Sequence, residues 1–180
     1  MGEFFWYYLV YGFLGFLLEV AFARLIHSPK PDRKCHLLLP VCPVYSVGAL
    51  AILVLPSSVK EVPLLLYLAG GFSATAVEWL TAIFYEKAAG VSFWNYRELP
   101  LNLNGRVCLW FSLFWGLLAL LLIDRIHPLV AALVSVVPPA LTLPAAALYL
   151  TDALFSLAVL RRSGTQGLRW YFRLKPYEAR

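Results

Sequence analysis

Charged residues are scarce in this sequence. Asp, Glu, Lys and Arg make up 14% of the 180 residues, whereas hydrophobic residues make up 61%, and the mean hydropathy is +0.74. A soluble domain of this length buries far less apolar surface than such a composition supplies. The composition therefore excludes an ordinary soluble protein and predicts one that lipid solvates.

Signatures of nucleotide binding and of catalysis are absent from the sequence. It contains no GxxxxGK[ST] phosphate-binding loop, no GxSxG nucleophile motif, no HExxH zinc motif and no GxGxxG dinucleotide fingerprint. The chain is therefore not by itself the ATPase of a pump, and we expect no cofactor. The net charge of +5 is interpreted as a signal of membrane orientation and not of nucleic-acid binding.

Cysteine and histidine are too few and too scattered to predict a disulfide framework or a metal site. The cysteines form neither a CxxC pair nor an even set, so we interpret them as packed thiols; they are Cys35, Cys42 and Cys108. The histidines lie at predicted membrane boundaries on both sides of the membrane, which disfavours a shared metal; they are His27, His36 and His127.

Long apolar segments are what the sequence has in abundance. A helix needs about 20 residues to cross roughly 30 Å of hydrocarbon. We predict an all-α fold, a polytopic integral membrane helix bundle of residues 1–160 with five spanning helices plus short re-entrant or interfacial segments, followed by a basic cytoplasmic tail, 161–180. The spans are predicted at residues 4–25, 36–55, 62–85, 107–123 and 140–160.

Prolines complicate two of these segments. In 36–55, Pro40 and Pro43 remove backbone donors, so the first part is expected to be extended or re-entrant and the regular helix to begin near Val44. The apolar stretch Leu129–Val137 is too short to cross a bilayer as a separate helix, and we interpret it as interfacial or re-entrant.

The basic residues predict the orientation. With five spans and an external N-terminus, 13 of the 15 Lys and Arg residues face the cytoplasm and only Lys60 and Arg125 lie outside. The first span begins at Phe4 with no basic residue before it, so we expect it to be retained and not cleaved as a signal peptide. The expected location is a bacterial inner membrane, with the C-terminus in the cytoplasm.

Ionisable side chains inside the spans are candidates for function, because a charge there is costly unless it meets a partner or a cavity. Glu19, Glu78 and Asp152 occupy such positions. Glu19 shares a helix face with Tyr8, Tyr11, Gly12 and Gly15, at spacings of three and four residues. A face that joins small residues, polar rings and one carboxylate is typical of an interior or substrate-facing stripe.

Glu78 and Glu86 are eight residues apart, which is about 80° of helical rotation, so they point to the same side. They either frame a common substrate path or pair with basic residues such as Arg97 or Arg106 and only hold the bundle together. Both interpretations stay open on the sequence alone.

The connection 88–106 has the densest set of polar side chains in the chain. It either binds a polar head group, an anion or a small solute at the mouth of the bundle, or it is a self-satisfied turn in which Gly105 takes a conformation that a larger residue disfavours. The predicted substrate-binding residues, including those in the spans, are Glu19, Glu78, Glu86, Trp94, Asn95, Tyr96, Asn102, Asn104 and Arg106.

Three sequence blocks carry a resemblance to a known family. They are the segment from Glu78 to Glu86 with the following Phe93-Trp94-Asn95-Tyr96, the block from Pro100 to Leu109, and the earlier Leu39-Pro40-Val41-Cys42-Pro43-Val44-Tyr45. Together they resemble the bacterial membrane proteins named putative ABC transporter permeases of type IV, over about Tyr8 to Leu160. The chain departs from the family pattern at Asn95, Arg97 and Ser46, where aspartate, serine and glycine are expected. The absence of an acid at Asn95 weakens any carboxylate role at that position.

The resemblance implies a transport role without naming a substrate. The leading hypothesis is a small membrane permease or substrate-binding membrane subunit with a polar intramembrane site, and the alternatives are a membrane enzyme acting on a lipid or isoprenoid head group or a structural or regulatory membrane subunit. The expected partners are membrane lipid, a separate ATPase subunit where ATP drives transport, and further copies of the chain. Nucleic acid is not expected.

Overall fold

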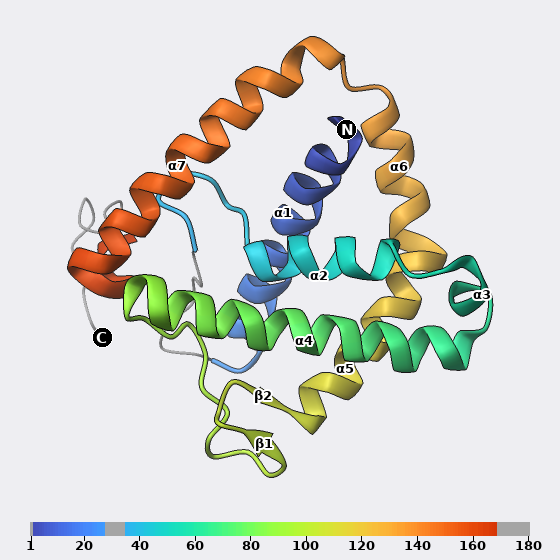
Figure 1. The fold of residues 1–180 in the computed structure, drawn as a ribbon, viewed down its shortest axis with the longest axis horizontal. Helices are drawn as coiled ribbons and strands as arrows, with labels where there is room; N and C mark the ends of the chain where they lie inside the picture. Colours follow the sequence, from blue (N-terminus) through green and yellow to red (C-terminus); the bar gives the residue numbers. More distant parts are fainter. Residues whose placement is uncertain (1, 28–34, 169–180) are drawn as a thin grey trace.

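Helices form most of the protein. The computed structural model describes residues 2–27 and 35–168 (Figure 1). Its α-helices are α1 (Gly2–Leu25), α2 (Pro43–Leu53), α3 (Ser57–Lys60), α4 (Pro63–Ala89), α5 (Leu109–Leu121), α6 (His127–Ser135) and α7 (Thr142–Ser163). The other elements are a π-helical turn, Leu122–Ile126, a 3-10 turn, Pro139–Leu141, and an antiparallel pair of short strands, β1 (Asn102–Leu103) and β2 (Val107–Cys108).

Four helical segments are long and apolar enough to cross a membrane. They are Gly2–Leu25, Pro63–Ala89, Leu109–Ser135 and Pro139–Leu168. Each contains most of one predicted span, so the chain is a multi-pass membrane protein. The last segment carries the helix past the predicted end at residue 160, and the basic tail from residue 169 onward lies outside the described residues.

The second predicted span, 36–55, is only partly helical. Its helix, α2, has 11 residues and is about 17 Å long at 1.5 Å per residue, which does not cross the hydrocarbon layer. The count of five spanning helices is therefore not confirmed. The helix begins at Pro43, as expected from the two prolines, and it lies against α4 and α1 (Figure 1) with Ser46 and Ile52 buried.

The interpretation of Leu129–Val137 as a separate interfacial or re-entrant segment is wrong. Helix α5 continues through the π-helical turn into α6, so that one helical segment runs from Leu109 to Ser135. Pro128 is the second residue of α6, two positions after the last residue of the π-helical turn, Ile126. A proline lacks the N–H group and crowds the carbonyl of the preceding turn, and a wider π turn accommodates it without ending the helix.

Small residues set the closest helix contacts. A Cβ atom at Gly71 of α4 would lie 3.2 Å from the Cα of Gly116 in α5, and one at Gly70 would lie 2.4 Å from the Cβ of Ala119. Glycine and alanine let two backbones approach in this way inside lipid, where packing drives helix association. The small residues of the predicted span 62–85 therefore form the contact between α4 and α5.

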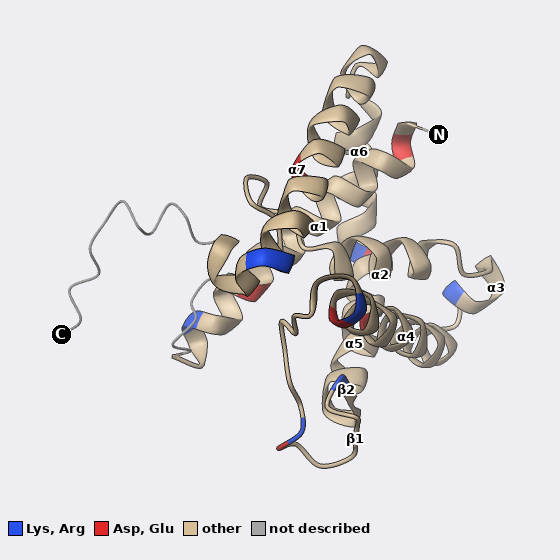
Figure 2. Ribbon diagram, turned by 60° about the vertical axis from the view of Figure 1, so that its left-hand side comes forward, with Lys and Arg blue, Asp and Glu red and all other residues tan. Residues whose placement is uncertain are grey.

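Basic side chains gather at one end of the bundle. The carboxyl ends of α4 and α7 meet there, where the Arg161 guanidinium donates to the carbonyl oxygen of Ala88. Arg106, in the loop after α4, pairs with Glu86 at the same end, whereas Lys60 lies in α3, beside the opposite end of α4 (Figure 2). The basic residues of the α1–α2 connection lie outside the described residues; they are Lys30, Arg33 and Lys34.

The contact between α1 and α2 predicts opposite outcomes for two glycine substitutions. A Cβ atom at Gly15 would lie 2.2 Å from the Cγ of Tyr45, whereas one at Gly48 meets nothing within 4 Å. We expect Gly15→Ala to lower the midpoint of thermal unfolding by about 3–10 °C, because overpacking costs roughly 1–3 kcal/mol. Gly48→Ala should keep or slightly raise it, since alanine favours a helix. Thermal unfolding in detergent measures both, and equal midpoints would contradict the close contact.

Candidate functional site

Glu78 is a buried carboxylate that three parts of the chain hold in place. It lies on α4 with 3% of its surface exposed. The hydroxyl of Tyr96, in the loop after α4, donates to Oε1 at 2.8 Å, and the indole N–H of Trp115, on α5, donates to Oε2 at 2.9 Å. Because an indole nitrogen only donates, Oε2 is an acceptor. Both carboxylate oxygens are thus satisfied by neutral donors.

Glu19 of α1 approaches from the other side through Tyr45. The Tyr45 hydroxyl donates to Oε1 of Glu19 at 2.7 Å, and the Tyr45 ring packs edge-to-face on Trp115 at a centroid distance of 5.1 Å. This position depends on Gly15, one turn before Glu19, because the Tyr45 side chain fills the space that a Cβ atom would need there. The predicted glycine and glutamate stripe of α1 therefore faces the interior.

The two carboxylates line one cavity of about 280 Å³, which we call the acidic aromatic cavity. Nine aromatic side chains make up most of its wall: Phe22, Tyr45, Phe93, Trp94, Tyr96, Trp110, Phe111, Phe114 and Trp115. Among the described residues that line it there is no Lys, Arg or His. The cavity therefore combines negative charge with aromatic surface.

Tyr96 connects the loop to the cavity. Its ring stacks on Phe111 with centroids 4.7 Å apart, and its backbone N–H donates to the carbonyl oxygen of Gly105 at 2.8 Å. Burial, together with the negative charge of Glu78, raises the pKa of the Tyr96 hydroxyl well above its ordinary value. The phenol therefore stays neutral and remains a donor to Glu78 at physiological pH.

The three predicted asparagines do not line the cavity. Asn102 donates to the carbonyl oxygen of Leu99 at 2.7 Å and accepts from the Gly105 N–H at 2.9 Å, and Asn95 accepts from the N–H of Arg97 at 3.0 Å. Asn104 is exposed and has a φ of +54°.

Gly105, with a φ of +73°, completes the turn, since a Cβ atom there would lie 2.6 Å from Arg97 Cγ. The amide side chains of Asn95 and Asn102 thus bond to the loop's own backbone, as in the self-satisfied turn that the sequence analysis left open.

Glu86 and Arg106 bind each other outside the cavity. The Arg106 guanidinium donates to Oε2 of Glu86 at 2.7 Å, and this hydrogen bond raises the pKa of Arg106. The Trp94 indole N–H donates to the carbonyl oxygen of Arg106 at 2.8 Å. The pair therefore fixes the loop on the end of α4, and Glu86 is not among the described residues that line the acidic aromatic cavity with Glu78.

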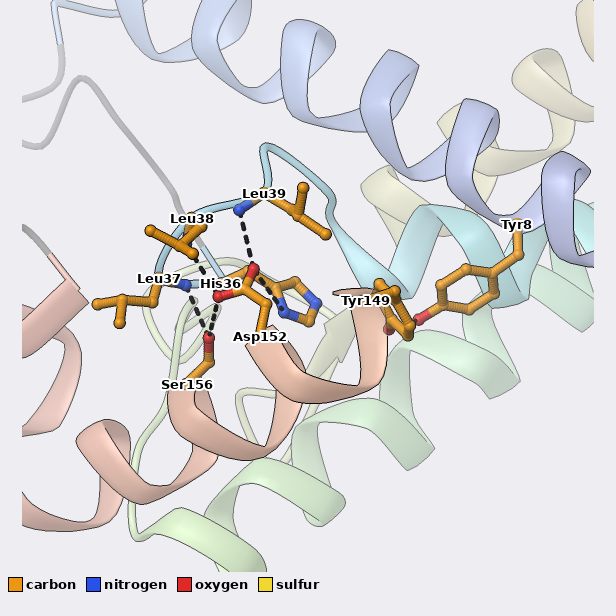
Figure 3. A network of polar contacts seen from close by, with 8 residues as sticks. All are labelled: Tyr8, His36, Leu37, Leu38, Leu39, Tyr149, Asp152 and Ser156. Carbon is orange, nitrogen blue, oxygen red and sulfur yellow. Dashed lines mark hydrogen bonds and ion pairs between the residues drawn. The ribbon is translucent and has the colours of Figure 1, made fainter. Parts of the chain in front are cut away.

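Asp152 of α7 is a second buried carboxylate, with 2% of its surface exposed, and it binds backbone. Its two oxygens accept from the N–H groups of Leu38 and Leu39 at 3.0 and 2.8 Å, and the hydroxyl oxygen of Ser156 accepts from the Leu37 N–H at 2.7 Å (Figure 3). His36 Nδ1 lies 3.9 Å from the carboxylate. We call Asp152 and Ser156 the α7 clamp, because they accept hydrogen bonds from backbone N–H groups of the non-helical chain before α2.

Several residues of these sites had no predicted role. Trp115 lies in an apolar span, and the only signal for it was that a buried indole N–H needs an acceptor. Tyr45 belonged to a quoted block but carried no assignment. The sulfur atoms of Cys35 and Cys42 lie 3.6 Å apart on the wall of the acidic aromatic cavity, a proximity that their seven-residue spacing did not predict.

The α7 clamp predicts a stability effect. In Asp152→Asn an amide nitrogen replaces one acceptor oxygen, which leaves a buried N–H unsatisfied at a cost of roughly 1–3 kcal/mol. We expect the thermal unfolding midpoint to fall by about 3–10 °C. Asp124→Asn, at an exposed position of the π-helical turn, is the matched control and should leave the midpoint unchanged. An equal midpoint for the two variants would show that the clamp contributes little.

Comparison with known proteins identifies the family. The chain matches the model of the family described as putative ABC-transporter type IV over residues 6–158. No curated protein and no solved structure gives a significant match. The matched region includes every residue that lines the acidic aromatic cavity and both residues of the α7 clamp. Because the match covers most of its length, this chain belongs to the putative ABC-transporter type IV family.

Proposed function

We propose that the protein is a small membrane permease or substrate-binding membrane subunit and that the acidic aromatic cavity holds its solute. The observation that carries the proposal is the buried carboxylate of Glu78, which lines a cavity of about 280 Å³ together with Glu19. A concave site with few polar groups in an apolar wall is the usual form of a small-molecule site. An ionisable residue inside a membrane span commonly marks such a pathway.

The contrast with Glu86 supports a binding role for Glu78. A carboxylate that only holds helices together is best stabilised by a paired cation, as Glu86 is by Arg106. Glu78 instead accepts from the neutral donors Tyr96 and Trp115. This arrangement orients the carboxylate and leaves its negative charge without a neutralising partner among those donors. A cavity beside such a charge favours binding over packing alone.

The enzyme hypothesis has less support. It assigns Glu78 and Glu86 to acid–base chemistry and Arg106 to a phosphate group, yet Glu86 and Arg106 bind each other at 2.7 Å. A phosphate would have to displace the Glu86 carboxylate from its bidentate ion pair before it reached the Arg106 guanidinium. Glu78 lies on another part of α4, in the cavity. The groups that such chemistry needs are therefore not assembled around one space.

For the membrane arrangement, we propose that residues 36–55 cross as a fifth, composite segment. The non-helical chain before α2, residues 35–42, adds length that the 11-residue helix lacks. The end with Arg106 and Arg161 then faces the cytoplasm, the N-terminus lies outside, and the membrane is a bacterial inner membrane. Where ATP drives transport, a separate ATPase chain docks at that basic end.

Native mass spectrometry of the protein released from its host membranes tests the binding role. We expect the wild type to carry a defined small molecule and Glu78→Gln to lose at least tenfold in occupancy, because the amide removes the charge and keeps the shape. Glu61→Gln, at an exposed position between α3 and α4, is the matched control and should retain the molecule. Equal occupancy in Glu78→Gln would contradict the proposal. An ATPase chain in stoichiometric amount would support the ATP-driven form.

A further inference from the structure

An apolar groove adjoins the acidic aromatic cavity. It encloses about 710 Å³ between α1 and the α5–α6 helix, with α2 contributing to its lining. Four residues line both spaces: Leu18, Val44, Tyr45 and Trp115. Among the described residues that line the groove, three have a polar side-chain atom: Tyr11, Tyr45 and Trp115. The cavity and the groove therefore meet at a shared wall, with the carboxylates on one side and apolar surface on the other.

The wall of the cavity fits a cation. Two carboxylates, Glu19 and Glu78, face it, and the described lining contains no basic side chain that would attract an anion. Aromatic rings attract organic cations through their negative faces, and nine of them line this space. An alkylated ammonium group suits such a wall better than a metal ion, because aromatic carbon offers a metal no ligand atoms and no group of metal-binding side chains is found among the described residues.

The groove fits an alkyl chain. Gly48 lies on α2 within it, and a Cβ atom there would meet nothing within 4 Å, so the space above this glycine is open. Tyr45 and Trp115, in edge-to-face contact, stand at the junction with the cavity. A chain that extends from a head group in the cavity would pass these two rings and continue over Gly48 between leucines of α1 and α5.

We propose that the two spaces bind one ligand, a cationic amphiphile whose ammonium head lies between Glu19 and Glu78 and whose alkyl tail lies in the groove. This inference rests on the proposed function and names the substrate class of the same site. Charge complementarity selects the head, and the apolar groove, which shares four lining residues with the cavity, selects a ligand with an apolar tail.

Binding of three probes to the full chain in neutral maltoside micelles tests the proposal. The probes are octyltrimethylammonium, octanesulfonate as the anion of equal chain length, and tetramethylammonium as the head without a tail. Saturable quenching of tryptophan fluorescence reports binding, since Trp94, Trp110 and Trp115 line the cavity. We expect octyltrimethylammonium to bind at least tenfold more tightly than tetramethylammonium, and octanesulfonate to show no saturable binding.

Variants separate the head site from the tail site. Glu78→Gln and, independently, Glu19→Gln should weaken octyltrimethylammonium binding at least tenfold, and Glu61→Gln should not change it. Gly48→Leu fills the groove and should remove the advantage of the octyl chain while tetramethylammonium still binds as before. The thermal unfolding midpoint of each variant confirms that it is folded, and the second glutamate variant provides the test if one variant unfolds.

Each of four results would overturn the proposal. Tight binding of octanesulfonate, or wild-type affinity for the cation in both glutamate variants, would exclude a cationic head. Equal affinity for the long and short cations would show that ordinary lipid fills the groove. If no cation binds while host membranes still yield a Glu78-dependent small molecule, the cationic class is wrong and the proposed function stands. If the probes do not bind and host membranes yield no Glu78-dependent small molecule, both the cationic class and the proposed function are wrong.

Discussion

The structure depends on hydrogen bonds to the backbone N–H groups of the non-helical chain before α2, residues 35–42. Inside a membrane, an unpaired N–H group costs several kcal/mol, so irregular chain persists only where protein supplies acceptors. The α7 clamp accepts from three successive N–H groups, Leu37 to Leu39, and the carbonyl oxygen of Gly12 in α1 accepts from the Cys42 N–H at 2.9 Å. These bonds place the start of α2 between helices that are distant in sequence.

The cavity follows from the position of α2. Because α2 starts at Pro43 against the glycines of α1, Tyr45 reaches both Glu19 and the ring of Trp115. Trp115 in turn binds Glu78, which also holds Tyr96. A chain of aromatic donors thus connects two carboxylates through four elements. Fixed donors of this kind keep polar groups oriented in an apolar surrounding, which is the preorganisation that a selective site requires.

The sequence predicted the features that depend on local pattern. Hydropathy located the long helices, the prolines located the start of α2, and the scarcity of charge inside the spans singled out Glu19, Glu78 and Asp152. It did not reveal that Pro128 sits in a continuous helix, because a π turn leaves no clear compositional trace. The sequence also did not predict the hydrogen-bond partners of each carboxylate.

Those partners come from residues tens of positions away, such as Trp115 for Glu78 and Leu39 for Asp152. Only the fold brings them together.

The cysteines allow a direct test of whether the acidic aromatic cavity admits cations. Cys35 and Cys42 line it, whereas Cys108 does not. The decisive measurement compares two thiosulfonate reagents of similar size, one with a trimethylammonium group and one with a sulfonate, on the reduced protein. With rates normalised to a free thiol, we expect the cation to modify Cys35 and Cys42 at least tenfold faster than the anion, without this preference at Cys108. Equal normalised rates at all three cysteines would contradict it.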